Sequence, residues 1–445
     1  MDYSNIVFGV NIAGISISIW GVLIALVLSI FLIIKKMNPA LAMFTGVFVG
    51  ALVGGADLLQ TMDVIILGGR QVVGINIRII AGGFLVGVLI ETGAAETIAR
   101  GIVKGLGEKR AILAIALAAA IVTAAGVFIT VALIIIAPIA LSVAYKANVS
   151  KFAAILAISG GGKAGNVMSP NPNTIAAAGS FDLPLSEVMI NGFIPGVVAL
   201  IATVLLCKMV QKKHFKVEAA DVEDPGDSTN LPSFGKSIVA PIVAIGLLML
   251  NPIGDILGIS FINSANLPMD PFYVLPIGAV VGLLVMGRGK SIADFATKGA
   301  IRMAPVVLML FGAGAIGGLI TVSVFPGMIE NTLYNMGIPI AYLAPLASTI
   351  FASATGSNAA GVIIGGDAFA SSILAAGVPA VAGAVMLHAG GGFLDIVPHG
   401  NIFLATQQGM KCSMVERIRV MPYEAAVGGI MTLTSVVMYL FGFWS

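Results

Sequence analysis

The sequence predicts an all-α membrane protein with about ten transmembrane helices and two re-entrant helical hairpins, organised as two inverted repeats. Of its 445 residues, 58% are hydrophobic and 10% are charged, whereas a soluble protein carries roughly a quarter charged residues. Two polar, glycine-rich stretches interrupt the apolar sequence, one in each half. Together these observations predict a helical bundle that encloses two interrupted helices within the bilayer.

The first polar stretch, residues 160–174, is unfavourable as a continuous helix. Its glycines hold a helix weakly, and Pro170 and Pro172 remove backbone donors. Non-helical backbone at membrane depth is tolerated where protein or a wet cavity surrounds it, and it marks the substrate sites of many transporters. We therefore expect this stretch to form one half of a binding site.

The second polar stretch, residues 390–401, repeats the pattern of three glycines followed by a proline and an asparagine. Placing Gly160 on Gly390 also aligns other glycines and aliphatic residues of the two halves. The additional pairs are Gly87 with Gly317, Leu89 with Leu319, Ile90 with Ile320 and Gly107 with Gly337. An internal duplication follows, with residues 1–207 as the first repeat, 208–236 as a cytoplasmic linker and 237–445 as the second repeat.

Charged and small residues divide the first repeat into segments. Apolar runs predict spans at 14–34, 39–56, 71–96 and 188–207, with a polar connection at 57–70 and a basic loop at 100–110. The run at 111–145 is too long for one crossing and is broken by small residues near its middle, which predicts a re-entrant hairpin. Residues 150–180 hold the first interrupted helix.

The second repeat shows the same order of segments. Its spans are predicted at 237–250, 271–286, 303–325 and 424–443, its re-entrant hairpin at about 340–374 and its interrupted helix at about 379–409. Five crossings in each half is an odd number, so the two repeats have opposite orientations. With the N-terminus outside, all but Arg70, Arg78 and Lys163 of the 23 Lys and Arg residues fall on the cytoplasmic side, as the positive-inside rule requires.

Polar residues inside the apolar segments are the candidate site residues, because such groups are costly in a membrane unless they are paired or hydrated. Lys163 and the positive ends of half-helices favour an anion, and hydroxyls and amides supply hydrogen bonds. The predicted substrate-binding residues are Thr130, Lys163, Asn166, Ser169, Asn171, Asn173, Thr174, Ser357, Asn358, His399 and Asn401. The predicted ion-coupling residues are Asp395, Asp367 and His388.

Several of these candidates have a structural alternative. Lys163 either binds the anion or pairs with Asp395 to hold the interrupted helices together. His388 either carries a proton or packs as a core histidine, and the polar residues at the breaks either bind substrate or cap helices. The same oxygens suit a sodium ion, so the coupling ion is a proton or sodium. An anion channel and an intramembrane metalloenzyme are rival functions, although no metal-ligand spacing is present and no cofactor or nucleic-acid partner is expected.

Three runs resemble the gluconate permease (GntP) family of the ion transporter superfamily: KMNPAL at 36–41, IETGAAETIA at 90–99 and GLGEKR at 105–110. The resemblance implies an inner-membrane symporter, not an enzyme, that moves a sugar acid or related organic anion with a proton. It also implies an elevator mechanism and, by analogy, a homodimer. Thr130 stands where the family typically has an acidic residue, which keeps a sodium-coupled di- or tricarboxylate transporter as the alternative.

Overall fold

The computed structural model describes residues 6–7, 10–12, 14–212, 215–222, 231–257 and 269–444, and these are predominantly helical. The strands Ile6–Val7 (β1) and Val10–Asn11 (β2) pair antiparallel. By length and composition, six described segments suffice to cross a membrane: Val73–Glu91, Ile129–Lys146, Phe193–Val210, Gly289–Thr321, Asn358–Ala375 and Met414–Leu440. The class of helical membrane protein is confirmed, whereas the count of about ten crossings stays a prediction.

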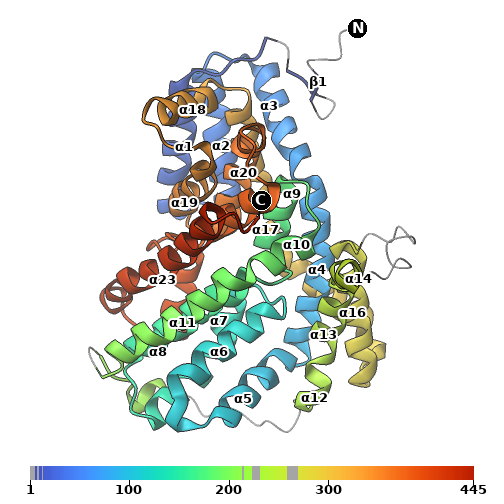
Figure 1. Ribbon diagram of the computed structural model, residues 1–445, viewed down its shortest axis with the longest axis vertical. Helices are drawn as coiled ribbons and strands as arrows, with labels where there is room; N and C mark the ends of the chain where they lie inside the picture. The colour runs from blue at the N-terminus through green and yellow to red at the C-terminus, as the bar shows by residue number, and fades with distance from the viewer. Residues whose placement is uncertain are drawn as a thin grey trace.

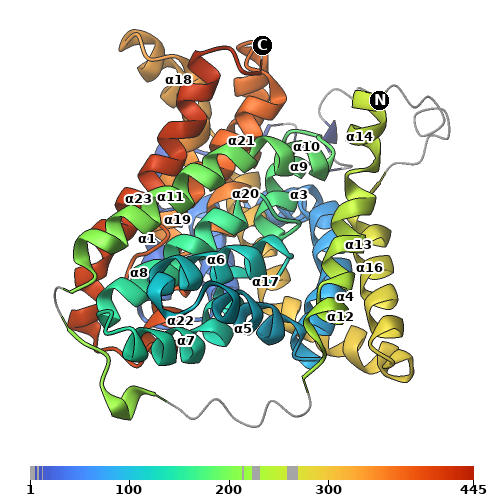
Figure 2. The same ribbon diagram turned by 60° about the horizontal axis from the view of Figure 1, so that its bottom comes forward.

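One group of helices surrounds the long helix α17, and we call it the α17 bundle. It consists of α1 (Ile19–Ile34), α2 (Pro39–Val53), α3 (Leu58–Gln71), α4 (Val73–Glu91), α13 (Val239–Leu248), α16 (Pro271–Val285) and α17 (Ile292–Thr321). Helix α17 packs against α2, α3 and α4, while α13 packs against α16. Figure 1 shows α3 and α4 as a long column along one side of the molecule, and Figure 2 shows α13 beside α16.

The second group contains two helical hairpins and two interrupted helices, and we call it the hairpin bundle. It consists of α6 (Ala111–Ala124), α7 (Ile129–Lys146), α8 (Lys151–Asn166), α9 (Pro172–Ser180), α10 (Leu185–Asn191), α11 (Phe193–Val210), α19 (Leu343–Thr355), α20 (Asn358–Ala375), α21 (Ala380–Gly391), α22 (Asn401–Gly409) and α23 (Met414–Leu440). Helices α6, α8 and α11 run side by side (Figure 1). Helix α7 contacts α22, and α20 contacts α9, so each hairpin packs on the interrupted helix of the other half.

Short elements connect the helices within and between these two groups. They are α5 (Ala94–Leu106), α12 (Phe234–Ser237), α14 (Leu250–Leu257) and α18 (Phe325–Asn335), with 3-10 turns at Glu108–Arg110, Ala219–Asp221, Gly289–Ser291 and Ile340–Tyr342. The polar connection expected at residues 57–70 is wrong, because Asp57 starts helix α3 with a capping box. Its carboxylate accepts from the Gln60 amide at 2.8 Å, and its own amide donates to the Gln60 side chain at 3.0 Å. The expected basic loop is likewise helical up to Leu106.

Glycine permits the turn of each hairpin. Helix α6 ends at Ala124 and α7 begins at Ile129, with Gly126 between them at a φ of 100°. Helix α19 ends at Thr355 and α20 begins at Asn358, with Gly356 at a φ of 68°. These φ values lie in the region that glycine adopts without steric cost. Both turns therefore reverse the chain in very few residues.

The interruption of the first broken helix is shorter than the sequence suggested. Residues 160–166 continue α8, and the break covers residues 167–171 only. Two glycines of α8 permit close packing against α6. A Cβ at Gly161 would lie 2.1 Å from the Ala116 carbonyl oxygen, and a Cβ at Gly165 would lie 2.0 Å from the Ala120 carbonyl oxygen. In the second interrupted helix the break covers residues 392–400.

We expect Gly161→Ala and Gly165→Ala each to destabilise the protein by about 1–3 kcal/mol, because an added methyl group would push α8 away from α6. Gly246→Ala in α13 is the matched control, since no atom lies within 4 Å of its added Cβ. Thermal unfolding of the purified variants measures the effect. Equal stability of all three variants would contradict the packing role of the α8 glycines.

Parts of the linker between the halves contact two helices of the first half, α8 and α5. Asp221 forms an ion pair of 2.7 Å with Lys151 at the start of α8, and the Lys151 amide donates to the Phe215 carbonyl at 3.0 Å. Further along, the Thr97 hydroxyl of α5 donates to the Pro232 carbonyl at 3.2 Å. Residues 213, 214 and 223–230 of the predicted linker lie outside the described residues.

Candidate functional site

Four helices begin at one small cavity between the hairpin tips and the two breaks. Its lining comes from the starts of α7, α9, α20 and α22 and from two neighbouring turns: Phe128, Ile129, Thr130, Asn173, Gly356, Ser357, Asn358, Ala359, Asp395, Asn401 and Ile402. The cavity volume is about 10 Å³, roughly the space of one water molecule. Because each of these helix ends is an N-terminus, the positive ends of four helix dipoles face the same point.

Two of the four helix ends are capped by side chains, and two are not. The Asn171 side chain accepts from the amide of Asn173 at 2.7 Å, at the start of α9. Ser357 caps α20 by accepting from the Ala360 amide at 3.4 Å. Within the described part of the chain, α7 and α22 have no side-chain cap. The Asn401 amide donates to the Gly356 carbonyl and the Val131 amide to the Phe128 carbonyl, each at 3.0 Å. Among the described residues, the other first-turn amides, those of Ile129 and Thr130 in α7 and of Ile402 and Phe403 in α22, remain as donors for a ligand.

A buried ion pair lies next to the cavity. Lys163, in the last turn of α8, donates to Asp395 at 2.5 Å and to the Gly392 carbonyl at 2.6 Å, and both charged side chains are 2% exposed. The second carboxylate oxygen of Asp395 has no hydrogen-bond partner among the described residues, and Asp395 lines the cavity. The structure thus shows the pairing of Lys163 with Asp395 that was one alternative for this lysine.

The predicted residues of the first break mostly build the break itself. The Asn166 carbonyl accepts from the Asn171 side chain at 2.5 Å, from Ser169 at 3.2 Å and from Thr174 at 3.4 Å. Asn171 also donates to the Ser169 hydroxyl at 2.6 Å. Among the predicted site residues of the first break, only Asn173 lines the cavity. Ser169, Asn171 and Thr174 therefore replace the hydrogen bonds that the interrupted helix gives up.

Apart from one oxygen of Asp367, five buried side-chain atoms of the hairpin bundle lack a partner within the described residues, and three of them belong to the cavity-lining residues Asn173, Asn358 and Asp395. They are the side-chain oxygens of Asn166, Asn173 and Asn358, one oxygen of Asp395 and Nδ1 of His388. His388, in α21, meets Asn166 through its other ring nitrogen at 3.4 Å. An unsatisfied buried polar atom costs about 1–3 kcal/mol. A cluster of such atoms at one place indicates a site that a ligand or ion completes.

The remaining predicted residues fall into two groups. Thr130 and Asn401 line the cavity. His399 does not, and its Nε2 lies 3.2 Å from the Ala354 carbonyl of the second hairpin. Asp367 lies in α20 and does not line the cavity. It packs against Gly317 of α17, where an added Cβ would lie 2.8 Å from its carboxylate. One Asp367 carboxylate oxygen is buried without a partner among the described residues.

A second buried ion pair was not predicted from the sequence. Arg417 and Glu424, both 0% exposed, form a two-pronged pair at 2.6 and 2.9 Å within α23. Arg417 also donates to the Thr406 hydroxyl of α22 at 2.6 Å and lies over the Phe403 ring at 4.7 Å. The spacing of seven residues on one helix face is the signal that could have revealed it. This pair fixes α22, whose first turn lines the cavity, to α23.

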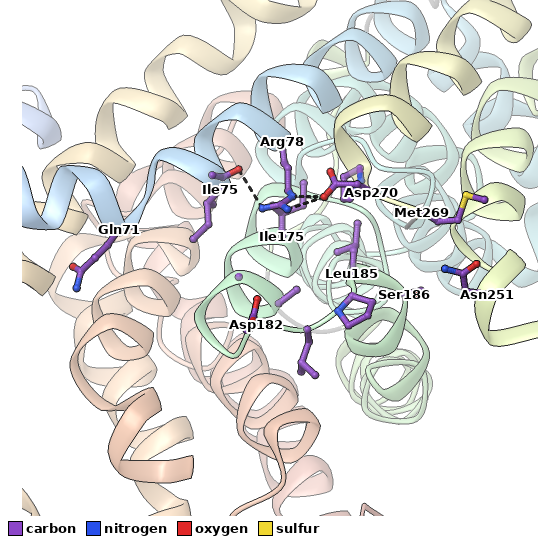
Figure 3. Close-up of a pocket in the computed structure, with 16 residues that line it drawn as sticks. Gln71, Ile75, Arg78, Ile175, Asp182, Leu185, Ser186, Asn251, Met269 and Asp270 are labelled. Carbon is purple, nitrogen blue, oxygen red and sulfur yellow. Dashed lines mark hydrogen bonds and ion pairs between the residues drawn. The ribbon is translucent and has the colours of Figure 1, made fainter. Parts of the chain in front are cut away.

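Two larger pockets lie at the boundary between the α17 bundle and the hairpin bundle, and we name each after its arginine. The Arg302 vestibule has a volume of about 270 Å³ and shares Phe128, Thr130 and Asn401 with the small cavity. The Arg78 vestibule has a volume of about 450 Å³. In Figure 3, Arg78 points toward Asp270, its partner at 2.7 Å, and Asp182 lies on the other side of this pocket.

Interrupted helices within an apolar multi-pass bundle, with helix N-termini facing a small cavity between them, are typical of membrane transporters. More specifically, residues 17–441 match the family described as "GntP family permease", and the chain belongs to that family. The resemblance seen in the sequence is thereby confirmed, and membership of a permease family points to a transporter rather than an enzyme.

Individual relatives agree with the family assignment. An uncharacterized transporter of Haemophilus influenzae is 44% identical over 95% of this chain and 98% of its own length. The high-affinity gluconate transporter of Escherichia coli is 24% identical over 68% of this chain and 67% of its own. The crystal structure of the YdaH transporter of Alcanivorax borkumensis covers 94% of this chain and 99% of its own with a TM-score of 0.63 and 14% identity, which shows a shared fold.

Proposed function

We propose that this protein is a secondary active transporter of the inner membrane that carries a small organic anion, such as gluconate or a related sugar or hydroxy acid, together with a proton. The observation that carries the proposal is the convergence of four helix N-termini on one small cavity beside the buried Lys163–Asp395 pair. Such ends bind carboxylate and phosphate groups through their free amides and dipoles. The E. coli relative is named as a gluconate transporter, which favours this class of anion.

The buried ion pair supplies a mechanism of coupling. Lys163 and Asp395 together are neutral, so an anion that entered alone would add an uncompensated charge to a buried site. A proton on Asp395 releases Lys163, whose ammonium then binds the carboxylate of the anion. The summed charge of the site stays at zero when the anion and the proton bind together. Each ligand therefore favours the binding of the other, and one proton accompanies each monovalent anion.

Substrate entry requires the site to open. A cavity of about 10 Å³ is far below the roughly 300 Å³ of small ligand pockets. In our proposal the hairpin bundle moves against the α17 bundle as an elevator, and the inverted repeats expose the site first toward one vestibule and then toward the other. The expected homodimer would hold the two α17 bundles in place.

Sodium coupling is the second candidate, and a specific observation favours it. The side-chain oxygens of Asn173 and Asn358 and one oxygen of Asp395 line the cavity and have no partner among the described residues. Uncharged and carboxylate oxygens are the ligands that hard cations prefer. The neighbouring Lys163 ammonium opposes a second cation at Asp395, so we place the proton first.

Uptake by purified protein in liposomes tests the proposal. We expect an inward proton gradient without sodium to drive accumulation of gluconate or of another acid from a panel of sugar acids, hydroxy acids and di- and tricarboxylates. Accumulation driven only by a sodium gradient would replace the proton by sodium. Equilibration without accumulation would indicate a channel, and no movement of any acid would contradict the proposed function.

A further inference from the structure

The Arg302 vestibule touches the small cavity but lies outside it. Phe128, Thr130 and Asn401 form the wall that the two spaces share. From the other side, α17 contributes Arg302, and the start of α2 contributes Asn38. A molecule that leaves the cavity past this wall therefore meets Arg302 next.

Arg302 retains free hydrogen-bond donors. One terminal nitrogen donates to one oxygen of Glu91 of α4 at 2.5 Å, and the other Glu91 oxygen pairs with Lys298 at 3.3 Å. Among the described residues, no acceptor contacts the remaining guanidinium nitrogens of Arg302, and its side chain is 39% exposed. Glu91 thus orients the guanidinium, and the remaining N–H groups of Arg302 can still donate hydrogen bonds to a carboxylate.

The Arg78 vestibule differs in its charge. Both Nε and Nη2 of Arg78 bind the same Asp270 oxygen, at 2.8 and 2.7 Å, and Asp182 adds a second carboxylate to the lining. No acidic residue is found among the described residues that line the Arg302 vestibule. The lining of the Arg302 vestibule therefore carries one positive charge, with the partner Glu91 outside the lining, whereas the lining of the Arg78 vestibule carries one positive and two negative charges.

We infer that the Arg302 vestibule is a second anion-binding site, in which the Arg302 guanidinium holds the carboxylate of the transported acid between the small cavity and the membrane face where α1 ends and α2 begins. This inference rests on the proposed function, because the anion is the same. The site is a waiting position: it binds the acid more weakly than the small cavity, since it is larger and offers one guanidinium in place of several helix N-termini. It concentrates anions at one face of the protein only.

Protection of an introduced cysteine tests this site without requiring transport. Val131 lines the Arg302 vestibule but not the small cavity, and the native Cys207 and Cys412 are buried. The background carries Lys163→Gln and Asp395→Asn, which remove the central charge pair together and leave no uncompensated buried charge. In this background we expect gluconate to slow the labelling of Val131→Cys by a water-soluble thiol reagent at least twofold.

Adding Arg302→Gln should raise the gluconate concentration needed for protection about tenfold, because a neutral amide cannot replace the charged fork. Arg302→Lys should keep part of the protection, and Arg78→Gln should leave it unchanged. Absence of protection in the background, or equal protection with Arg302→Gln, would overturn the second site. Failure of the proposed function is seen separately, as lack of gluconate accumulation by the unmodified protein.

Discussion

Replacing Lys163 with alanine is expected to abolish accumulation of the anion, with a loss of about a hundredfold or more in uptake rate. A hydrogen bond to a charged group contributes about 1.5–3 kcal/mol, and each 1.4 kcal/mol is a factor of ten. The variant removes this bond to the anion and also leaves Asp395 without its buried partner at 2.5 Å. Uptake of radiolabelled substrate into liposomes under a proton gradient measures the loss.

Lys151→Ala is the matched control for this variant. Lys151 lies in the same helix and also pairs with a carboxylate, Asp221 at 2.7 Å, but it lies at the other end of α8, away from the cavity. We expect Lys151→Ala to keep most of the uptake. Because the loss of one buried charge can itself unfold a protein, the Lys163→Gln/Asp395→Asn double variant serves as a folded, inactive reference. Normal uptake by Lys163→Ala would contradict the assigned role of this lysine.

Replacing Asp395 with asparagine is expected to uncouple transport from the proton gradient. Asparagine cannot take up the proton, and it leaves the Lys163 ammonium permanently free for the anion. In the unmodified protein, anion affinity should fall as pH rises, by up to about tenfold per pH unit once Asp395 loses its proton. In Asp395→Asn the affinity should not change with pH, accumulation should be lost, and exchange of external for internal anion should continue.

The variant Asp367→Asn tests whether the coupling proton binds to Asp367 rather than to Asp395. Asp367 lies against Gly317 of α17 and not at the cavity, so its variant should keep both the pH dependence of binding and proton-driven accumulation. Binding measured at several pH values, together with accumulation and exchange assays, distinguishes the variants. A flat pH profile in Asp367→Asn combined with a normal profile in Asp395→Asn would move the proton site from Asp395 to Asp367.

Much of this fold was predictable because lipid forbids unpaired backbone groups. Stretches with glycine and proline inside an oily sequence had to be enclosed by protein, and both lie in the hairpin bundle around one cavity. Hydropathy alone did not predict α3, since a capping box starts this helix in a segment with charged residues. The glycine content also placed residues 160–166 in the interruption, because the sequence does not show that Gly161 and Gly165 face the α6 backbone.

The sequence predicted which residues belong to the candidate site better than it predicted the contacts that these residues make. Asn173, Asn358 and Asp395 meet at the cavity, although they come from different halves of the chain. Sequence could not separate them from Ser169 and Asn171, which bond within the break, because all are small polar residues near prolines or glycines. The role of Arg302 was hidden for a different reason: a basic residue near a helix end satisfies the positive-inside rule, whatever it faces.

A structure of the protein with bound gluconate tests the central claim most directly. We expect density for its carboxylate about 3 Å from the first-turn amides of α7 and α22, with Lys163 turned from Asp395 toward the anion. Density for the acid away from these helix ends, with the Lys163–Asp395 pair still intact, would contradict the account.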